Sequence, residues 1–374
     1  MERCLKYPPS KFLANIGFIF WSAILLAPCA DATASGVENP LAETHDHERS
    51  RRPWSTSGKY TAHKNFEEHF VSGRRLAGLV APKPLVLPYH NGPILSRMNN
   101  VTKLYVIYYG AFTRIQRLTV RRFFRSLAPP RHRARASIPT VAKWWEITKG
   151  YQDVWGESVA QLLIPSGEIE DKSYSRGRTL DQRDIEALLL KLPHILSNQG
   201  FCQEACGQHA YLYPSGATGG QMLPYVWVGD ASTQCPGLCC WPFANLNYTF
   251  MENSQDKPLL PPSGEVGVDG MIINLAKLIA GAATDPYQNA YYQGDAAAPV
   301  EAAEACSGIF GCGAYAGYPG SLMKDPVTGS SFNSFGSRGY KFLLPWMWDP
   351  KTFTCAGQSH QSTNSLQFDL NLAC

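Results

Sequence analysis

The sequence lacks the motifs that would identify its chemistry directly. Its 374 residues contain no Gly-rich phosphate-binding loop, no Gly-x-Ser-x-Gly nucleophile elbow and no other nucleophile signature. No internal repeat is present, which excludes a repeat architecture. Paired carboxylates for glycoside hydrolysis need no local signature, so that class stays open. Asp230 and Asp269 are its first candidates.

Cysteine is absent from position 30 to position 201, which excludes disulfides from that stretch. Two of the 11 cysteines, Cys4 and Cys29, lie near the N-terminus. The other nine all lie in the C-terminal half: Cys202, Cys206, Cys235, Cys239, Cys240, Cys306, Cys312, Cys355 and Cys374. In an oxidising compartment such clustering predicts disulfides. Because nine is odd, at least one thiol is free or bonds another chain.

Acidic residues are almost absent from residues 97–150, which hold 12 Lys and Arg against the single acid Glu146. From Gly200 onward the balance reverses, with 6 basic and 13 acidic residues. The net charge of +4 therefore hides one strongly basic region. On an extracellular protein, such a region favours an anionic wall or matrix polymer over nucleic acid as partner.

The N-terminal end has the pattern of a secretory signal. Basic residues precede an apolar run over residues 12–27, and Ala30-Asp31-Ala32 places small residues at the positions that signal peptidase reads. We predict a signal peptide over residues 1–32 and a mature chain that begins near Thr33. An uncleaved membrane anchor is the alternative, disfavoured because the run is short for a membrane span. No later segment is expected to cross a bilayer, so the mature protein is predicted to be soluble and extracellular.

Residues 33–80 are polar and show no sustained hydrophobic period, which predicts a disordered N-terminal segment. A single domain is expected over residues 81–374. Two sequons, at Asn100 and Asn247, are predicted glycosylation sites and fit the same export route.

Strands and helices alternate through the first part of this domain. The segment Val101–Gly110 is typical of a buried strand, and the next helix begins at Thr113 as N-cap. Further helices are expected over "TVAKWWEITKGYQ", with its tryptophans inward, and over "TLDQRDIEALLLKL", opened by Thr179 or Asp181. "SVAQLLIP" and "LPYVWVGD" predict strands. The expected class is α/β (α+β), a mixed sheet flanked by helices, completed by a loop-rich, disulfide-tied C-terminal part.

Several long motifs resemble the plant EXORDIUM, or phosphate-induced protein, family. They include "YHNGPIL", "YVIYYG", "GFCQEACGQH", "VWVGDASTQCPGLCCWPF", "GEVGVDGMIINLAKLIAG", "YYQGDAAAPVEAAEACSGIFGCGAYAGYPG" and "KFLLPWMWDP", spread over residues 85–355. The resemblance implies an apoplastic protein of the growing cell wall, linked to brassinosteroid-dependent growth, cell expansion and nutrient status. It brings no established catalytic reaction.

The resemblance also sorts the cysteines. Those that match the family pattern are Cys202, Cys206, Cys235, Cys239, Cys306 and Cys355, and the structural bridges are assigned to them. Cys240, Cys312 and Cys374 depart from it. Two of these three are expected to form one more disulfide, which leaves one thiol. A second departure is "HILSNQ", which replaces a longer strand-like run and indicates either a shortened central strand or an imperfect gene model.

Some members of the wider family resemble zincins, with His-Glu-x-x-Glu in the helix that follows "VDGM". The resemblance places that motif on Lys277, Leu278 and Gly281 of the helix over residues 267–286, whose start Asp269 is expected to cap. A lysine ammonium, an apolar leucine and a glycine offer no lone pair to zinc at neutral pH. We therefore predict a zincin-like core without its metal ligands. The alternative is a helix that was never catalytic, in which Gly281 only lets another element approach.

"CQEACGQH" is a second metal candidate, because Cys202, Cys206 and His209, with Cys235 or Cys239, have ligand-like spacing. Outside the cell such thiols are oxidised, so disulfides are favoured and His209 is expected at the surface or in a loop.

The helix after Thr113 suggests a polyanion-binding face. Arg114, Arg117, Arg121 and Arg125 recur at i, i+3, i+7 and i+11, which aligns them for de-esterified pectin. A solvated arginine face is the simpler interpretation. Trp346, Trp348 and the tyrosines of "YAGYPG" are able to stack on sugars, although aromatic residues in such number usually form core.

Together these observations favour a secreted, apoplastic, non-enzymatic protein that modulates cell expansion and brassinosteroid-dependent growth. Its expected partners are an anionic wall polysaccharide such as pectin, another wall polymer or a cell-surface receptor, with no nucleic acid, no membrane and no cofactor. The alternative is a secreted hydrolase, metal-dependent or glycoside-cleaving, that acts on wall components. A lectin-like module for neutral glycans is a third interpretation.

Overall fold

A computed structural model provides the fold. It describes residues 21–28, 61–62, 85–96, 100–129, 138–177, 180, 182–190, 205–216, 218–230, 236–244, 258–295, 299–315 and 317–358.

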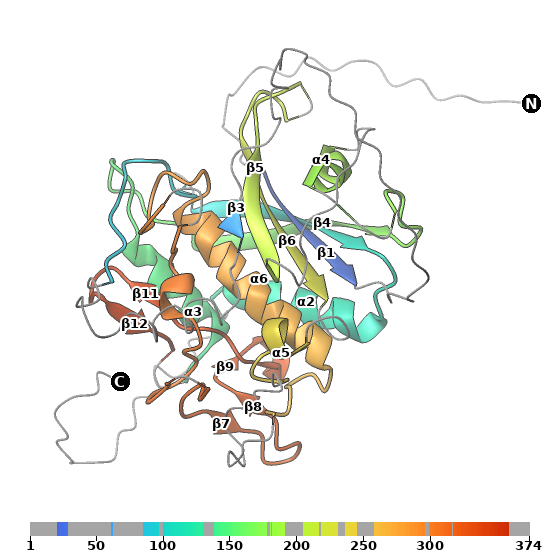
Figure 1. Cartoon of the computed structure of the whole chain (residues 1–374), viewed down its shortest axis with the longest axis vertical. Helices are drawn as coiled ribbons and strands as arrows, with labels where there is room; N and C mark the ends of the chain where they lie inside the picture. Colours follow the sequence, from blue (N-terminus) through green and yellow to red (C-terminus); the bar gives the residue numbers. More distant parts are fainter. Residues whose placement is uncertain are drawn as a thin grey trace, which may run out of the picture.

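A six-stranded mixed sheet forms the centre of the protein, in the order β2-β5-β6-β1-β3-β4 (Figure 1). Strands β1, β3, β4 and β6 run parallel, whereas β5 is antiparallel to β6 and β2 is antiparallel to β5. The bounds are Trp21–Pro28 for β1, Thr61–Ala62 for β2, Val101–Tyr109 for β3, Leu162–Asp171 for β4, Gly207–Leu212 for β5 and Leu223–Asp230 for β6.

Helices lie on both faces of this sheet. Helix α6 (Val266–Thr284) crosses the face formed by β5 and β6, and α2 (Arg114–Leu127) packs beside β4 and α6 (Figure 1). Helix α4 (Gln182–Leu190) lies on the opposite face. The expected mixed sheet with flanking helices is therefore present.

Alternation along the strands divides the core in two, because successive strand residues point to opposite faces. Val106 and Tyr108 of β3 pack in the larger cluster, which α2 and α6 complete. Ile107 and Tyr109 pack in a smaller cluster with Ile185 of α4.

Local signals explain the helices that follow β3. Thr113 caps α2, and the capping box with Gln116 is complete, as the sequence predicted for the N-cap. Helix α3 (Val141–Glu146) continues into the 3₁₀ turn η1 (Ile147–Gly150). Trp144 and Trp145 are buried, which confirms the prediction that they point inward.

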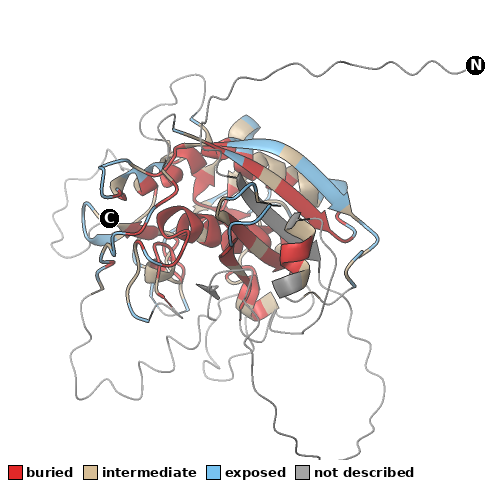
Figure 2. Cartoon of the chain, turned by 90° about the horizontal axis from the view of Figure 1, so that it is seen from above, coloured by how far each residue is buried: buried red, intermediate tan, exposed pale blue. Residues whose placement is uncertain are grey.

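Other predicted strand boundaries agree with the structure only in part. The strand "LPYVWVGD" coincides with β6, whereas β4 begins later than "SVAQLLIP" and runs on to Asp171. β4 forms one edge of the sheet and is largely exposed, as the pale blue strand of Figure 2 shows. Thr179 and Asp181, the expected caps of α4, lie outside the described residues, as does "HILSNQ".

The strand β1 lies within the segment expected to be the signal peptide. It pairs with β3 on one side, from Trp21 opposite Lys103, and with β6 on the other, up to Pro28 opposite Asp230. Its apolar sequence suits a central parallel strand, which is covered on both faces. Signal cleavage stays a prediction, and a chain that began at Thr33 would lack this strand. Of the expected polar segment 33–80, only Thr61–Ala62 is described, as β2.

The C-terminal part is built from loops and two-stranded ribbons around α6. Its short elements are α5 (Pro236–Cys239), η2 (Glu304–Cys306), β7 (Met323–Lys324), β8 (Ser331–Phe332), β9 (Ser334–Phe335), η3 (Ser337–Gly339), β10 (Lys341–Phe342), β11 (Met347–Asp349) and β12 (Thr354–Ala356). A disulfide joins Cys306 to Cys355, and another joins Cys206 to Cys239. The expected loop-rich part with disulfides is therefore present.

Helix α6 is apolar on nearly all sides because the protein surrounds it. Among the described helices it is long and apolar enough to cross a bilayer, so the prediction that no segment after the N-terminal run has this composition is wrong. Of its membrane-length window, 89% is buried inside the protein. Burial in the domain core therefore accounts for its composition.

Candidate functional site

The candidate site lies where α6 meets β5, at Gly281. A Cβ atom at this glycine would lie 2.4 Å from Glu301 Oε2 and 3.0 Å from His209 Nε2. Both distances are below the normal contact of a Cβ atom, so only glycine lets these side chains approach the helix. Close approach of another element is the alternative role predicted for Gly281.

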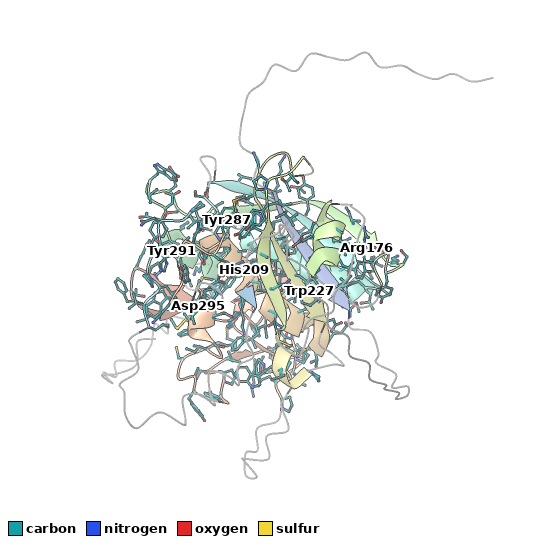
Figure 3. The ribbon with its side chains drawn as sticks, turned by 45° about the horizontal axis from the view of Figure 1, so that its top comes forward. Arg176, His209, Trp227, Tyr287, Tyr291 and Asp295 are labelled. Carbon is teal, nitrogen blue, oxygen red and sulfur yellow. A yellow bond between two sulfur atoms is a disulfide. The ribbon has the colours of Figure 1, made fainter. Side chains whose placement is uncertain are left out.

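The approaching groups form a buried pair. His209 Nε2 lies 2.7 Å from Glu301 Oε2, and the side chains are 0% and 1% exposed. His209 belongs to β5, and Glu301 precedes η2 (Figure 3 labels His209 beside β5). The prediction that His209 lies at the surface or in a loop is wrong, because strand alternation turns it toward α6.

Burial lowers the pKa of His209 to about 4, although the carboxylates of Asp285 and Glu304 act in the opposite direction. A neutral imidazole donates one N–H. Nδ1 has no hydrogen-bond partner among the described residues, whereas Nε2 faces Glu301. A neutral His209 therefore makes its hydrogen bond among the described residues through Nε2, to Glu301 Oε2.

Two further ionisable groups lie on α6 and just after it. Asp285 is fully buried, and its Oδ1 accepts from the backbone N–H groups of Asn289 and Ala290, each at 2.7 Å. Burial raises the pKa of Asp285. Lys277 is partly exposed; desolvation lowers its pKa, and Glu304 opposes that change.

Three residues of α6 stand at the positions that the resemblance assigns to zinc ligands. Leu278 is fully buried in the main core, Lys277 is a cation and Gly281 has no side chain. Within the described part of the chain, no group of three or more His, Cys, Asp or Glu residues is placed to hold a metal ion. The absence of zinc from α6 stays a prediction.

The second metal candidate is also tested in part. Cys206 and Cys239 share a disulfide, so neither offers a thiolate to a metal. Cys202 and Cys235 lie outside the described residues. Cys240 is buried, and Cys312 is disulfide-bonded. Cys374 also lies outside them.

The two candidate carboxylates for glycoside hydrolysis are both buried. Asp230 ends β6, and Asp269 lies in the first turn of α6, whose N-cap is Glu265; the prediction that Asp269 caps the helix is wrong. Asp269 Oδ2 accepts from the Ser263 backbone N–H at 2.8 Å and from its hydroxyl at 2.7 Å. Burial nevertheless raises the pKa of Asp269 to about 7.

The arginine face of α2 is partly neutralised by β4. Arg117 forms an ion pair with Glu170, and Arg121 Nε lies 2.9 and 2.8 Å from the two carboxylate oxygens of Glu168. Arg114 and Arg125 are exposed. Two of the four guanidinium groups therefore already have an anionic partner within the protein.

One of the two sequons and the candidate sugar-stacking aromatics lie within the described residues. Asn100 is exposed at the turn before β3, although its side-chain oxygen accepts from the Gln161 backbone N–H at 2.6 Å. Asn247 lies outside the described residues. Trp348 is core, as expected of most aromatics here, whereas Tyr315 is 69% exposed.

Comparison with known proteins agrees with the resemblance. The family described as Phosphate-induced protein 1 conserved region matches residues 87–358. Protein EXORDIUM-like 2 of Arabidopsis thaliana is 41% identical over 297 residues, which cover 76% of this chain and 93% of that protein. The chain belongs to the EXORDIUM/phosphate-induced protein family.

Other relatives are similarly close. Protein EXORDIUM of Arabidopsis thaliana is 39% identical over 301 residues, covering 76% of this chain and 93% of the relative. Protein PHOSPHATE-INDUCED 1 of Nicotiana tabacum is 38% identical over 304 residues, covering 76% and 92%. No solved structure matches the chain, so the zincin-like character of this EXORDIUM-family core stays a prediction.

Proposed function

We propose that this EXORDIUM-family chain is a secreted, non-enzymatic protein of the apoplast that modulates cell expansion and brassinosteroid-dependent growth by binding a wall polymer or a receptor. Family membership supports the growth role, through the resemblance set out above. The Cys206–Cys239 and Cys306–Cys355 disulfides support export, because such bonds persist in oxidising compartments and are rare in the cytosol.

The observation that carries the non-enzymatic part is the environment of Gly281. An imidazole and a carboxylate within hydrogen-bond distance are typical of hydrolytic sites. Here both are excluded from solvent, and α6 closes over them. A general base must reach the proton that it abstracts, which a side chain 0% exposed does not do in this conformation. The pair therefore fits a structural role better than a catalytic one.

The hydrolase remains the second candidate because of the same pair, and a substitution at His209 separates the two. In His209→Gln the amide still donates a hydrogen bond to Glu301, but it performs no acid–base chemistry at neutral pH. Plants that lack an endogenous relative would receive the wild-type chain or this variant. We expect equal recovery of cell length with both, provided that apoplastic fluid contains equal amounts of folded protein.

Loss of the growth effect by a folded, exported His209→Gln chain would contradict the non-enzymatic proposal. Absence of the wild-type chain from the apoplastic fluid would contradict export instead. The two failures are therefore distinguishable in one experiment.

A further inference from the structure

The hairpin Gly311–Ser321 displays a pair of tyrosines at its tip. Tyr315 and Tyr318 exchange backbone hydrogen bonds in both directions, at 3.0 and 2.8 Å. In such a hydrogen-bonded antiparallel pair, both side chains point to the same face. The ring centroids lie 5.1 Å apart at an interplanar angle of 35°. The two rings form one aromatic surface, of which Tyr315 is 69% exposed.

The root of this hairpin is held rigidly. A Cβ atom on Gly320 would lie 2.1 Å from the carbonyl oxygen of Gly311, so the two strands approach as closely as glycine allows. Ser321 N–H donates to the Cys312 carbonyl at 2.8 Å, and Cys312 is itself disulfide-bonded.

Phe310, next to the root, connects the hairpin to the core. It is 1% exposed and packs in a cluster with Ile273 of α6, and its ring lies 5.7 Å from that of Trp241. The root of the hairpin is therefore anchored in the core, which reduces the ordering cost of binding at its tip. Single exposed aromatics are common, but a rigidly mounted pair on one face is not explained by packing.

The absence of charged residues from the hairpin favours an uncharged ligand. No charged residue occurs between Cys306 and Met323. Recognition at the tip therefore depends on ring faces and hydroxyl groups rather than on ion pairs. A flat ring with a hydroxyl edge suits the C–H face and hydroxyls of a pyranose. A stable protein partner would need about 800 Å² on each side, far more than two tyrosine rings offer.

We propose that Tyr315 and Tyr318 form a binding site for an uncharged polysaccharide chain. The site rests on the proposed function, since it names the wall polymer and the residues that hold it. It differs from the arginine face of α2, which would select an anionic polymer.

Affinity electrophoresis of the full disulfide-bonded protein tests this site, with soluble hydroxyethyl cellulose in the gel as the uncharged glucan and polygalacturonate as the anionic one. We expect retardation by the glucan that does not change between low and high salt. Tyr315→Ala should weaken it by about tenfold or more, equivalent to about 1.4 kcal/mol. Tyr315→Phe keeps the ring and should stay within about threefold of the wild type.

Trp155→Ala is the matched control, because Trp155 is a 78% exposed aromatic outside the hairpin. It should leave retardation unchanged, and thermal unfolding should show that all variants are folded.

Three results would overturn the proposal. The wild type is not retarded by the uncharged glucan, Tyr315→Ala binds as the wild type does, or the only retardation is by polygalacturonate and disappears in salt. A chain that fails these tests but restores growth contradicts the glucan site and not the growth role. A chain that binds glucan without altering growth contradicts the growth role and not the glucan site.

Discussion

His209 and Glu301 meet directly against Gly281, with 2.7 Å between Nε2 and Oε2 and essentially no solvent exposure of either side chain. The two residues are 92 positions apart in the chain. Their contact joins β5 to the segment before η2 through one polar interaction, directly beside α6. Burying an ionisable pair costs folding free energy unless the two groups are well hydrogen-bonded. A substitution that disturbs this hydrogen bond is therefore expected to destabilise the fold.

Gly281→Ala is expected to destabilise the protein. Alanine is favoured over glycine in a helix by about 1 kcal/mol, so propensity alone predicts stabilisation. The new methyl group would lie 2.4 Å from Glu301 Oε2, however, and overpacking costs about 1–3 kcal/mol. We expect a net loss in the free energy of unfolding, measured by urea titration. Gly216→Ala is the control, because a Cβ atom there meets nothing within 4 Å; equal effects of the two substitutions would contradict steric contact at Gly281.

Neutral His209 should make the protein less stable in acid. Its pKa is about 4 when folded and 6.5 when unfolded. The unfolded chain therefore binds more protons between these values, and a contribution on the order of 3 kcal/mol is lost as pH falls from 6.5 to 4. The difference in unfolding free energy between wild type and His209→Gln should shrink over that window.

The comparison with His209→Gln is needed because Asp269 acts in the opposite direction. Its pKa is about 7 when folded against 3.8 when unfolded, so its contribution is present in acid and is lost as pH rises from 3.8 to 7. Subtraction of the variant removes this common term. Parallel stability profiles for wild type and His209→Gln would show that His209 does not titrate as described.

The arginine face should bind pectin weakly until its internal partners are removed. Glu168 and Glu170 pair with Arg121 and Arg117, so replacing both glutamates by glutamine frees two guanidinium groups. We expect the double variant to elute from a polygalacturonate column at higher salt than the wild type. An unchanged elution salt would show that the pairs do not limit the arginines, and Arg121→Ala alone should change wild-type retention little.

Local patterns in the sequence predicted the elements that local forces decide. Thr113 and Gln116 set the start of α2 through a capping box, and the apolar run of β6 is long enough to mark a buried strand. β5 was not predicted, because "CQEACGQH" was interpreted only as a metal or disulfide motif, with His209 at the surface or in a loop. A histidine that shares one strand face with Gly207 and Tyr211, at spacings of two residues, was the available signal.

Contacts between distant segments were not predictable in the same way. Nothing near His209 in the sequence indicates Glu301, because their contact depends on how α6 packs on the sheet. The ion pairs of α2 with β4 likewise required the parallel pairing of β3 and β4. The exposure of Tyr315 depends on two close glycine contacts at the root of its hairpin, whereas aromatic composition alone favoured a core position.

Removal of residues 1–32 should destabilise the sheet, because β1 has a hydrogen-bonded neighbour on each side. Without Trp21–Pro28, the facing edges of β3 and β6 lose their shared partner, and buried backbone groups without partners are costly. We expect the chain 33–374 to unfold at a lower temperature than the chain 1–374, with the loss measured by circular dichroism under matched conditions. N-terminal sequencing of protein from apoplastic fluid shows which form is exported. A product that begins near Thr33 and is as stable as the full chain would show that β1 is not needed for the fold, whereas an exported chain that retains residues 21–28 would contradict the predicted signal cleavage.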